Sequence, residues 1–165
     1  MAEQLAPGQL AAYFALMEVS SLLQHAVEQQ LRADGGLSWV QFQILARLAD
    51  APGGQQRMTD LADAVVYSRS GLTYQAGLLQ KAGLITREPS VDDERSVTVT
   101  VSDAGRALVG TVLPGHVAVV RQQLLAPLTA RDLATLTTVL GRVRDRMRAA
   151  PPRSAAIRSR HKPGT

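Results

Sequence analysis

The stretch of sequence that decides the fold runs from Thr59 to Arg87 and reads TDLADAVVYSRSGLTYQAGLLQKAGLITR. Thr59 is expected to cap a short helix over residues 60–65, because a side-chain oxygen at that position accepts a hydrogen bond from a free backbone amide. Ser68 is expected to cap a second helix, which Gly83 ends in the left-handed conformation that glycine favours. Two short helices joined by a tight turn predict a helix-turn-helix.

The segment that follows changes from a helical to a β periodicity. Residues 84–87 and 97–101 predict two short strands, and the second alternates valine with hydroxyl residues, which is typical of a strand with one buried face. Residues 88–96 lie between them and predict a polar loop. A hairpin directly after a helix-turn-helix predicts a winged helix, with a DNA-binding core over about residues 38–101.

Longer helices are predicted on both sides of this core. Residues 9–32 carry two apolar stripes at helical spacing, and Ser38 with Gln41 fits a capping box at the start of another helix. Residues 103–148 predict two more helices, the first of which Pro114 should kink. We therefore expect a mainly α protein with a small β-hairpin wing and long dimerisation helices.

Charge is distributed unevenly along the 165 residues, whose formal net charge is +4. Residues 1–150 hold 14 basic and 14 acidic residues, so the four basic residues within 151–165 account for the whole excess. We expect residues 1–150 to form one winged-helix domain and residues 151–165 a basic, disordered tail, because the tail has too few apolar residues to bury. The basic isoelectric point is therefore a weak argument for nucleic acid.

Several functional classes lack their characteristic residues. The chain has no cysteine, which excludes disulfides, thiolate zinc sites and thiol-based oxidant sensing. It has no glycine-rich phosphate loop, HExxH or GxSxG motif, so we expect no catalytic residues, no metal site and no cofactor. No apolar run approaches the roughly 18 residues of a membrane span. The predicted location is the cytoplasm, with nucleoid association when the protein is bound to DNA.

The second helix of the helix-turn-helix has two different sides on a helical wheel. Leu72, Ala76 and Leu79 form the side expected to face the core. The opposite side carries Ser70, Thr73, Tyr74, Gly77 and Lys81, and Arg69 lies nearer the border, at the start of the helix. This side has no carboxylate that phosphate would repel, and its hydroxyl and basic groups suit a major groove. The alternative is an ordinary solvated helix.

Arg95 lies in the predicted wing loop, from which its side chain could reach an adjacent minor groove. Asp93 could pair with Arg95 and hold the shape of the loop. The alternative for Arg95 is a plain surface ion pair without contact to DNA.

Apolar residues in the last predicted helix follow alternating spacings of three and four, as in a short coiled-coil seam. They are Leu133, Leu136, Leu140, Val143 and Met147. This seam and the two stripes of the first helix, which include Leu10 and Phe14, predict a two-fold homodimer. The alternative is that both helices pack within one chain.

Several motifs occur in one order along the chain: residues 38–45, 59–62, 68–73, 81–85, 93–95 and 101–105. Together they resemble the MarR family of bacterial winged helix-turn-helix regulators. The resemblance implies a homodimer, with the first helix and the last two helices at its interface, that binds a pseudo-palindromic operator in double-stranded DNA. It also implies a repressor that a small-molecule effector releases. By motif, Ser68, Arg69, Ser70 and Thr73 would face the groove, and Arg95 would be the wing-tip arginine.

The same analogy places an effector pocket near Tyr13, Met17, Trp39 and Phe42, although plain core packing is the alternative for these residues. The sequence departs from the family pattern at Tyr74, where a basic residue is common, and at two glycines in the second helix. A winged helix that binds protein without specific DNA binding, and a MarR-type activator, both remain open.

Overall fold

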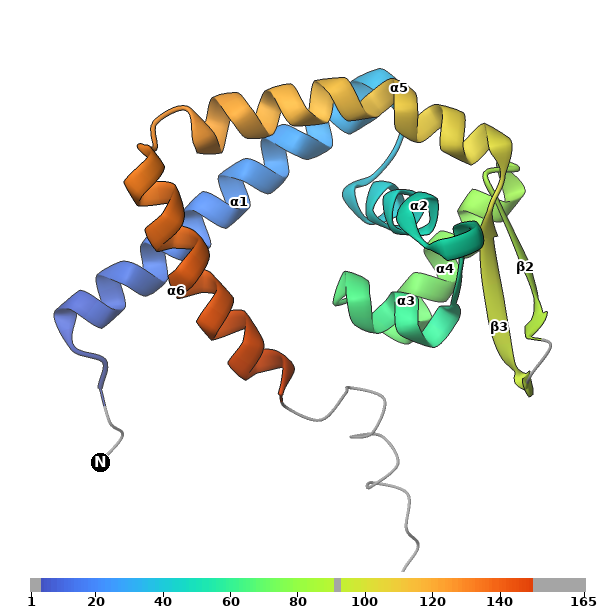
Figure 1. Ribbon diagram of the computed structural model, residues 1–165, viewed down its shortest axis with the longest axis horizontal. Helices are drawn as coiled ribbons and strands as arrows, with labels where there is room; N and C mark the ends of the chain where they lie inside the picture. Colours follow the sequence, from blue (N-terminus) through green and yellow to red (C-terminus); the bar gives the residue numbers. More distant parts are fainter. Residues whose placement is uncertain (1–3, 91–92, 150–165) are drawn as a thin grey trace, which may run out of the picture.

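A computed structural model of the chain describes residues 4–90 and 93–149, apart from the side chains of residues 93–95 (Figure 1). The predicted tail over residues 151–165 lies outside the described residues. The elements are α1 (Pro7–Gly35), α2 (Trp39–Asp50), η1 (Pro52–Gly54), β1 (Gln55–Arg57), α3 (Met58–Val65), α4 (Arg69–Lys81), β2 (Ile85–Ser90), β3 (Asp93–Val101), α5 (Asp103–Val120), η2 (Arg121–Leu125) and α6 (Ala130–Arg148). This order confirms the predicted mainly helical fold with a small wing.

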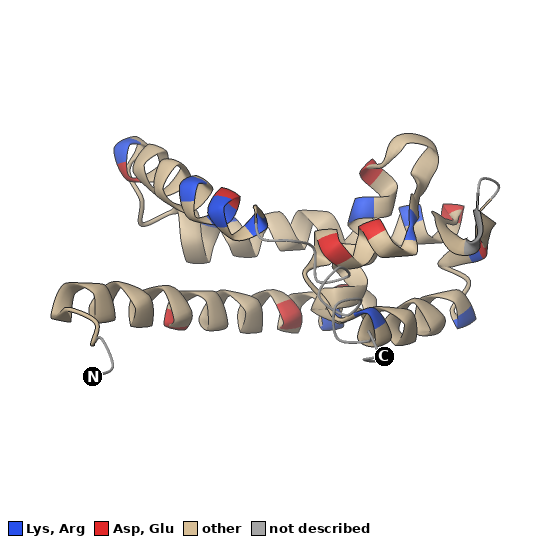
Figure 2. Ribbon diagram, turned by 90° about the horizontal axis from the view of Figure 1, so that it is seen from below, with Lys and Arg blue, Asp and Glu red and all other residues tan. Residues whose placement is uncertain are grey.

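The helices form a compact lobe and a long arm (Figure 1). α1 and α5 lie side by side along the arm, whereas α2, α3, α4 and the sheet form the lobe at one end of α5. α6 turns back from the far end of the arm. It overlaps α1 in Figure 1, but Figure 2 shows the two helices apart.

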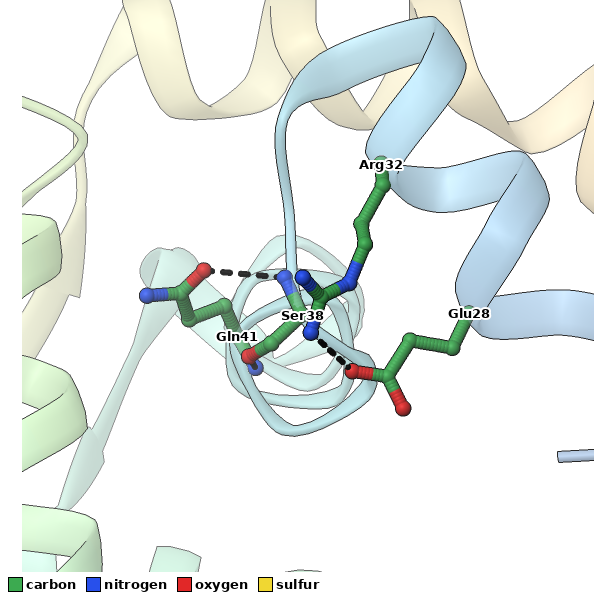
Figure 3. Close-up of polar contacts among 4 residues, drawn as sticks. All are labelled: Glu28, Arg32, Ser38 and Gln41. Carbon is green, nitrogen blue, oxygen red and sulfur yellow. Dashed lines mark hydrogen bonds and ion pairs between the residues drawn. The ribbon is translucent and has the colours of Figure 1, made fainter. Parts of the chain in front are cut away.

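Capping side chains fix the ends of several helices. In the capping box of α2, the Gln41 backbone N donates to Ser38 Oγ at 3.3 Å and the Ser38 backbone N donates to Gln41 Oε1 at 3.0 Å (Figure 3). The same figure shows the 2.8 Å ion pair between Arg32 and Glu28 in the last turns of α1. Ser68 caps α4 as the sequence predicts, and Ser102 and Thr129 cap α5 and α6.

The cap predicted at Thr59 is wrong. α3 begins at Met58, Arg57 occupies the N-cap position, and no side chain caps the helix there. The Thr59 hydroxyl instead donates to Asp60 Oδ1 at 3.4 Å. The physical reason is that the strand β1 runs directly into α3, so its last extended residue takes the N-cap position.

The sheet has three antiparallel strands in the order β1-β3-β2. β1 was not expected, because its three polar residues show no apolar alternation; it pairs Gln55 with Thr100 and Arg57 with Thr98. β2 and β3 also extend into the segment predicted as a loop over residues 88–96. Pro89 fits there because β2 is an edge strand and a register shift follows between Pro89 and Ser90.

The core of the lobe joins the helix-turn-helix to its neighbours. Leu72, Ala76 and Leu79 of α4 are buried, which confirms the predicted inner side of that helix. They belong to one cluster of buried apolar residues with Leu61 of α3 and Val99 of β3. Burying three residues of α4 in this way leaves its other side to solvent.

α1 is apolar and largely exposed. An 18-residue window of this helix has a mean hydropathy of 1.2 and is 6% buried, so by length and composition α1 could cross a membrane. No such segment was expected from the sequence, because its apolar side chains are interrupted by small and polar residues. Figure 2 shows few charged bands along α1 and more basic ones along α6.

α5 continues as a helix through Pro114 and is followed by the π-helical turn η2. Beside the proline, Gln30 Nε2 of α1 donates to the Val112 carbonyl of α5 at 3.1 Å and to Asp34 Oδ2 at 2.8 Å. These contacts hold the C-terminal half of α1 against α5.

Candidate nucleic-acid interface

The N-terminus of α4 is fixed by a tight turn and a serine cap. The Tyr67 backbone N donates to the Ala62 carbonyl at 3.2 Å, which closes the turn between α3 and α4. The Gly71 backbone N donates to Ser68 Oγ at 3.2 Å. A helix N-terminus carries the positive end of the helix dipole and free amides, so the exposed start of α4 suits a phosphate group.

The residues of α4 predicted to contact DNA, from the wheel and from the family resemblance, are exposed. Ser68, Arg69, Ser70, Thr73, Tyr74 and Lys81 are all exposed. The Thr73 hydroxyl donates to the Arg69 carbonyl at 2.8 Å, and its oxygen can still accept a hydrogen bond. α4 contains no acidic residue. The predicted groove-facing side chains of α4 are therefore all exposed, on a helix that has no carboxylate to repel phosphate.

Leu78 belongs to this surface and was not predicted. Its side chain is 36% exposed, and it lies one helical turn after Tyr74. Its position four residues after Tyr74, on the same side of the helix, was the available signal.

The C-terminal half of α4 is tied to the sheet. Arg87 Nε of β2 donates to Gln80 Oε1 of α4 at 2.6 Å. Because Arg87 lies in the wing and Gln80 near the end of α4, this bond helps fix the angle between the two elements. This contact therefore helps determine the geometry of any surface that α4 and the wing form together.

The two predicted wing residues are only partly described. Asp93 begins β3 and Arg95 lies within it, so both belong to a strand and not to a loop. Their side chains lie outside the described part of the chain. The minor-groove contact of Arg95 and its support by Asp93 therefore stay predictions.

The residues predicted for dimerisation lie on apolar surfaces of α1 and α6. Leu10, Phe14, Leu133, Leu140, Val143 and Met147 are exposed, and Leu136 is half-buried. No described residue of α6 is buried, and α6 packs closely against no other element of the described chain. Exposed apolar stripes on two long helices are an unfavourable arrangement for an isolated chain in water.

The four residues predicted for an effector pocket fall into two groups. Trp39 and Phe42 stack on each other with ring centroids 6.1 Å apart. Tyr13 packs beside Phe14 at 5.4 Å, and both Tyr13 and Met17 are exposed on the N-terminal half of α1. Within one chain, Trp39 and Phe42 therefore pack with the core of the lobe, whereas Tyr13 and Met17 lie exposed on the arm.

His116 of α5 completes the aromatic cluster and was not singled out from the sequence. Its ring centroid lies 4.8 Å from that of Phe42 and 5.9 Å from that of Trp39. Burial lowers the pKa of His116 from its usual 6.5. Its Nδ1 is buried and has no hydrogen-bond partner among the described residues. Sequence reasoning missed His116 because it is isolated in the sequence and forms no metal-ligand spacing with other residues.

The described residues contain no group of three His, Cys, Asp or Glu side chains that could hold a metal ion. A groove of about 400 Å³ lies over the solvent side of the sheet, lined by residues of β1, β2 and β3. None of the four residues predicted for the effector pocket lines this groove.

A helix-turn-helix followed by a hairpin defines the class of winged helix-turn-helix proteins. The sequence model of the MarR family matches residues 35–96. The chain is 32% identical to the HTH-type transcriptional regulator PecS of Dickeya dadantii (strain 3937), over 78% of this chain and 76% of that one. The chain therefore belongs to the MarR family of transcriptional regulators, and it is a regulator and not an enzyme.

Other relatives support the same family assignment, both in sequence and in structure. The HTH-type transcriptional repressor YetL of Bacillus subtilis (strain 168) is 28% identical over 66% of this chain and 65% of its own length. The MarR family regulator Sco3205 of Streptomyces coelicolor, solved in complex with DNA, superposes with a TM-score of 0.83 at 28% identity, over 87% of this chain and 94% of that one. AbsC of the same organism gives a TM-score of 0.83 at 30% identity, over 90% and 99%.

Proposed function

We propose that the chain is a dimeric, sequence-specific DNA-binding regulator that inserts α4 into the major groove of an operator. The observation that carries this proposal is the outer surface of α4, which is exposed, free of carboxylates and held in place by the Ser68 cap. The DNA complex of the similar regulator Sco3205 supports it.

The arrangement of charge on α4 fits a groove bounded by phosphates. Arg69 lies at the first turn and Lys81 at the last, and a helix of this length spans about 20 Å. Arg69 adds forked donors that can recognise a guanine edge, whereas Lys81 offers a point charge to a phosphate. Ser68, Ser70 and Thr73 contribute hydroxyl groups between the DNA backbones.

A second copy of the chain is the partner that the exposed apolar surfaces fit best. α6 lacks close packing partners among the described residues, and α1 exposes apolar side chains along most of its length. A two-fold axis would place the same stripes of both chains against one another. The dimer would then present two copies of α4 about 34 Å apart, which matches one turn of B-DNA.

The regulator acts in this proposal as a repressor on a pseudo-palindromic operator, and a small-molecule effector releases it. The repressor named YetL supports the direction of regulation. The cytoplasm, with association to the nucleoid through DNA, is the proposed location.

Gel shifts on the promoter region of the protein's own gene test this function. At low salt we expect a retarded complex with specific duplex that unrelated duplex does not displace, and a weaker complex at high salt because bound phosphates release counterions. Arg69→Ala should weaken specific binding by about 5- to 150-fold if Arg69 reads a base. Arg47→Ala removes another exposed arginine, on α2, and serves as the matched control.

Two results would contradict the proposed function. One is the absence of a shift at low salt, which would favour a winged helix that binds protein. The other is equal binding to every duplex, which would leave only non-specific phosphate contact. Recovery of the chain in the membrane fraction would instead assign the apolar surface of α1 to lipid.

A further inference from the structure

One large side chain projects freely from the middle of α4. Tyr74 is 65% exposed, more than any other large apolar or aromatic residue of this helix in the described structure. Gly71 lies three residues before it and Gly77 three residues after it. Residues three apart are neighbours on a helix surface, so neither glycine adds a side chain of its own beside the tyrosine ring, although the Tyr67 ring packs at Gly71.

The surface on either side of the ring is weakly polar. Leu78 lies one turn after Tyr74 and Ser70 one turn before it, so the three side chains form one line along α4. Gln75 is half-buried, and the side-chain Oε1 of Gln80 accepts from Arg87 Nε. The middle of α4 therefore offers apolar surface to a groove, whereas its forked donor, Arg69, lies at the first turn.

Only one major-groove edge matches an apolar contact. Guanine presents two acceptors, adenine an acceptor and an amino donor, cytosine an amino donor, and thymine an acceptor and a 5-methyl group. We propose that Tyr74, together with Leu78, reads the 5-methyl group of a thymine in each half-site of the operator. This inference rests on the proposed function, because it needs α4 in the major groove.

The test removes the methyl group and nothing else from the DNA. The full chain is used to select the tightest duplex from a random library, and that duplex is made again with each thymine replaced singly by uracil. We expect binding to weaken about three- to tenfold at one or two positions that recur symmetrically in both half-sites. Replacement at the other thymines should leave affinity unchanged.

Variants of the protein then assign the effect to the ring. Tyr74→Ala should bind the thymine and uracil duplexes equally, because the methyl group has lost its partner. Tyr74→Phe should keep the discrimination, since it lacks only the hydroxyl. Arg69→Ala is the control on the same helix, and it should bind more weakly while keeping the thymine-to-uracil ratio of the parent protein.

The outcomes separate this inference from the function on which it rests. Failure to select any duplex overturns both. Selection of a duplex in which no uracil weakens binding overturns the inference and leaves specific DNA binding intact. Discrimination that survives in Tyr74→Ala, or that disappears in Tyr74→Phe, also overturns it; the second result would assign the hydroxyl to a phosphate. The uracil scan uses the parent protein, so a scan without any effect overturns the inference even if Tyr74→Ala fails to fold.

Discussion

Two glycines of α4 that look equivalent in the sequence have different surroundings. A Cβ atom added at Gly71 would lie 2.6 Å from Tyr67 Cε1 and 2.8 Å from Ser68 Oγ, so the small residue makes room for the turn and the cap. The nearest atom to a Cβ at Gly77 is Arg87 Nη2, at 4.0 Å. Gly71 is thus needed for close packing, whereas Gly77 is not.

This difference predicts opposite effects of the same substitution. Gly77→Ala should raise the free energy of unfolding by about 0.5–1 kcal/mol, because alanine favours the helix and no neighbour has to move. Gly71→Ala should lower it, since the clash with Tyr67 and Ser68 outweighs the helical preference. Urea unfolding of the two variants and the parent checks both signs. Equal stabilisation by the two alanines would contradict the packing described around Gly71.

Residue-level reasoning from the sequence predicts the inner side of α4 well. Leu72, Ala76 and Leu79 are buried because helical spacing alone determines which side chains share a side. The same spacing places Leu78 on the side of Tyr74, where the structure leaves it 36% exposed. The role of Gly71 depends on a ring from outside the helix, so the sequence left it open.

At the scale of elements, α2 and α5 meet through the cluster of Trp39, Phe42 and His116. Burial lowers the pKa of His116, so the folded chain favours the neutral ring more than the unfolded chain does. The unfolded chain therefore binds more protons as pH falls through about 6.5, and stability decreases in that direction.

A pH series of thermal unfolding measures this contribution. We compare melting temperatures at about pH 7.5 and pH 5.5, which bracket the ordinary histidine pKa. Over this range the melting temperature of the parent protein should decrease more than that of His116→Gln. The glutamine does not titrate, so its variant lacks this part of the decrease. An identical decrease in both proteins would show that His116 is not coupled to folding.

Elements with strong local signals were predicted, and elements that depend on tertiary pairing were not. The caps at Ser38 and Ser68 form because the serine oxygen and the backbone amide that donates to it lie within one turn. β1 has no apolar pattern and exists because its backbone pairs with β3. That strand also displaces the start of α3 to Met58, which is why the cap predicted at Thr59 was wrong.

For the whole molecule, the exposed apolar seam of α6 predicts a dimer, and a single charged residue introduced into this seam should dissociate it. Leu140→Glu should convert the dimer to monomers, because a carboxylate in an apolar interface lacks a partner. Sedimentation velocity measures the change. Val97→Glu is the matched control, since Val97 has a similar exposure of 39%, against 38% for Leu140, but lies on the sheet. Dissociation by both variants, or by neither, would contradict the assignment of α6 to the interface.

A footprint on DNA tests the central claim most directly, because it reports the dimer and its recognition helices together. Hydroxyl-radical cleavage of the promoter duplex, with the full chain bound, should show two symmetric protected segments whose centres lie about 10 base pairs apart. Arg69→Ala should weaken both segments equally. A single protected segment, or uniform protection of any duplex, would contradict a dimer that reads two half-sites through α4.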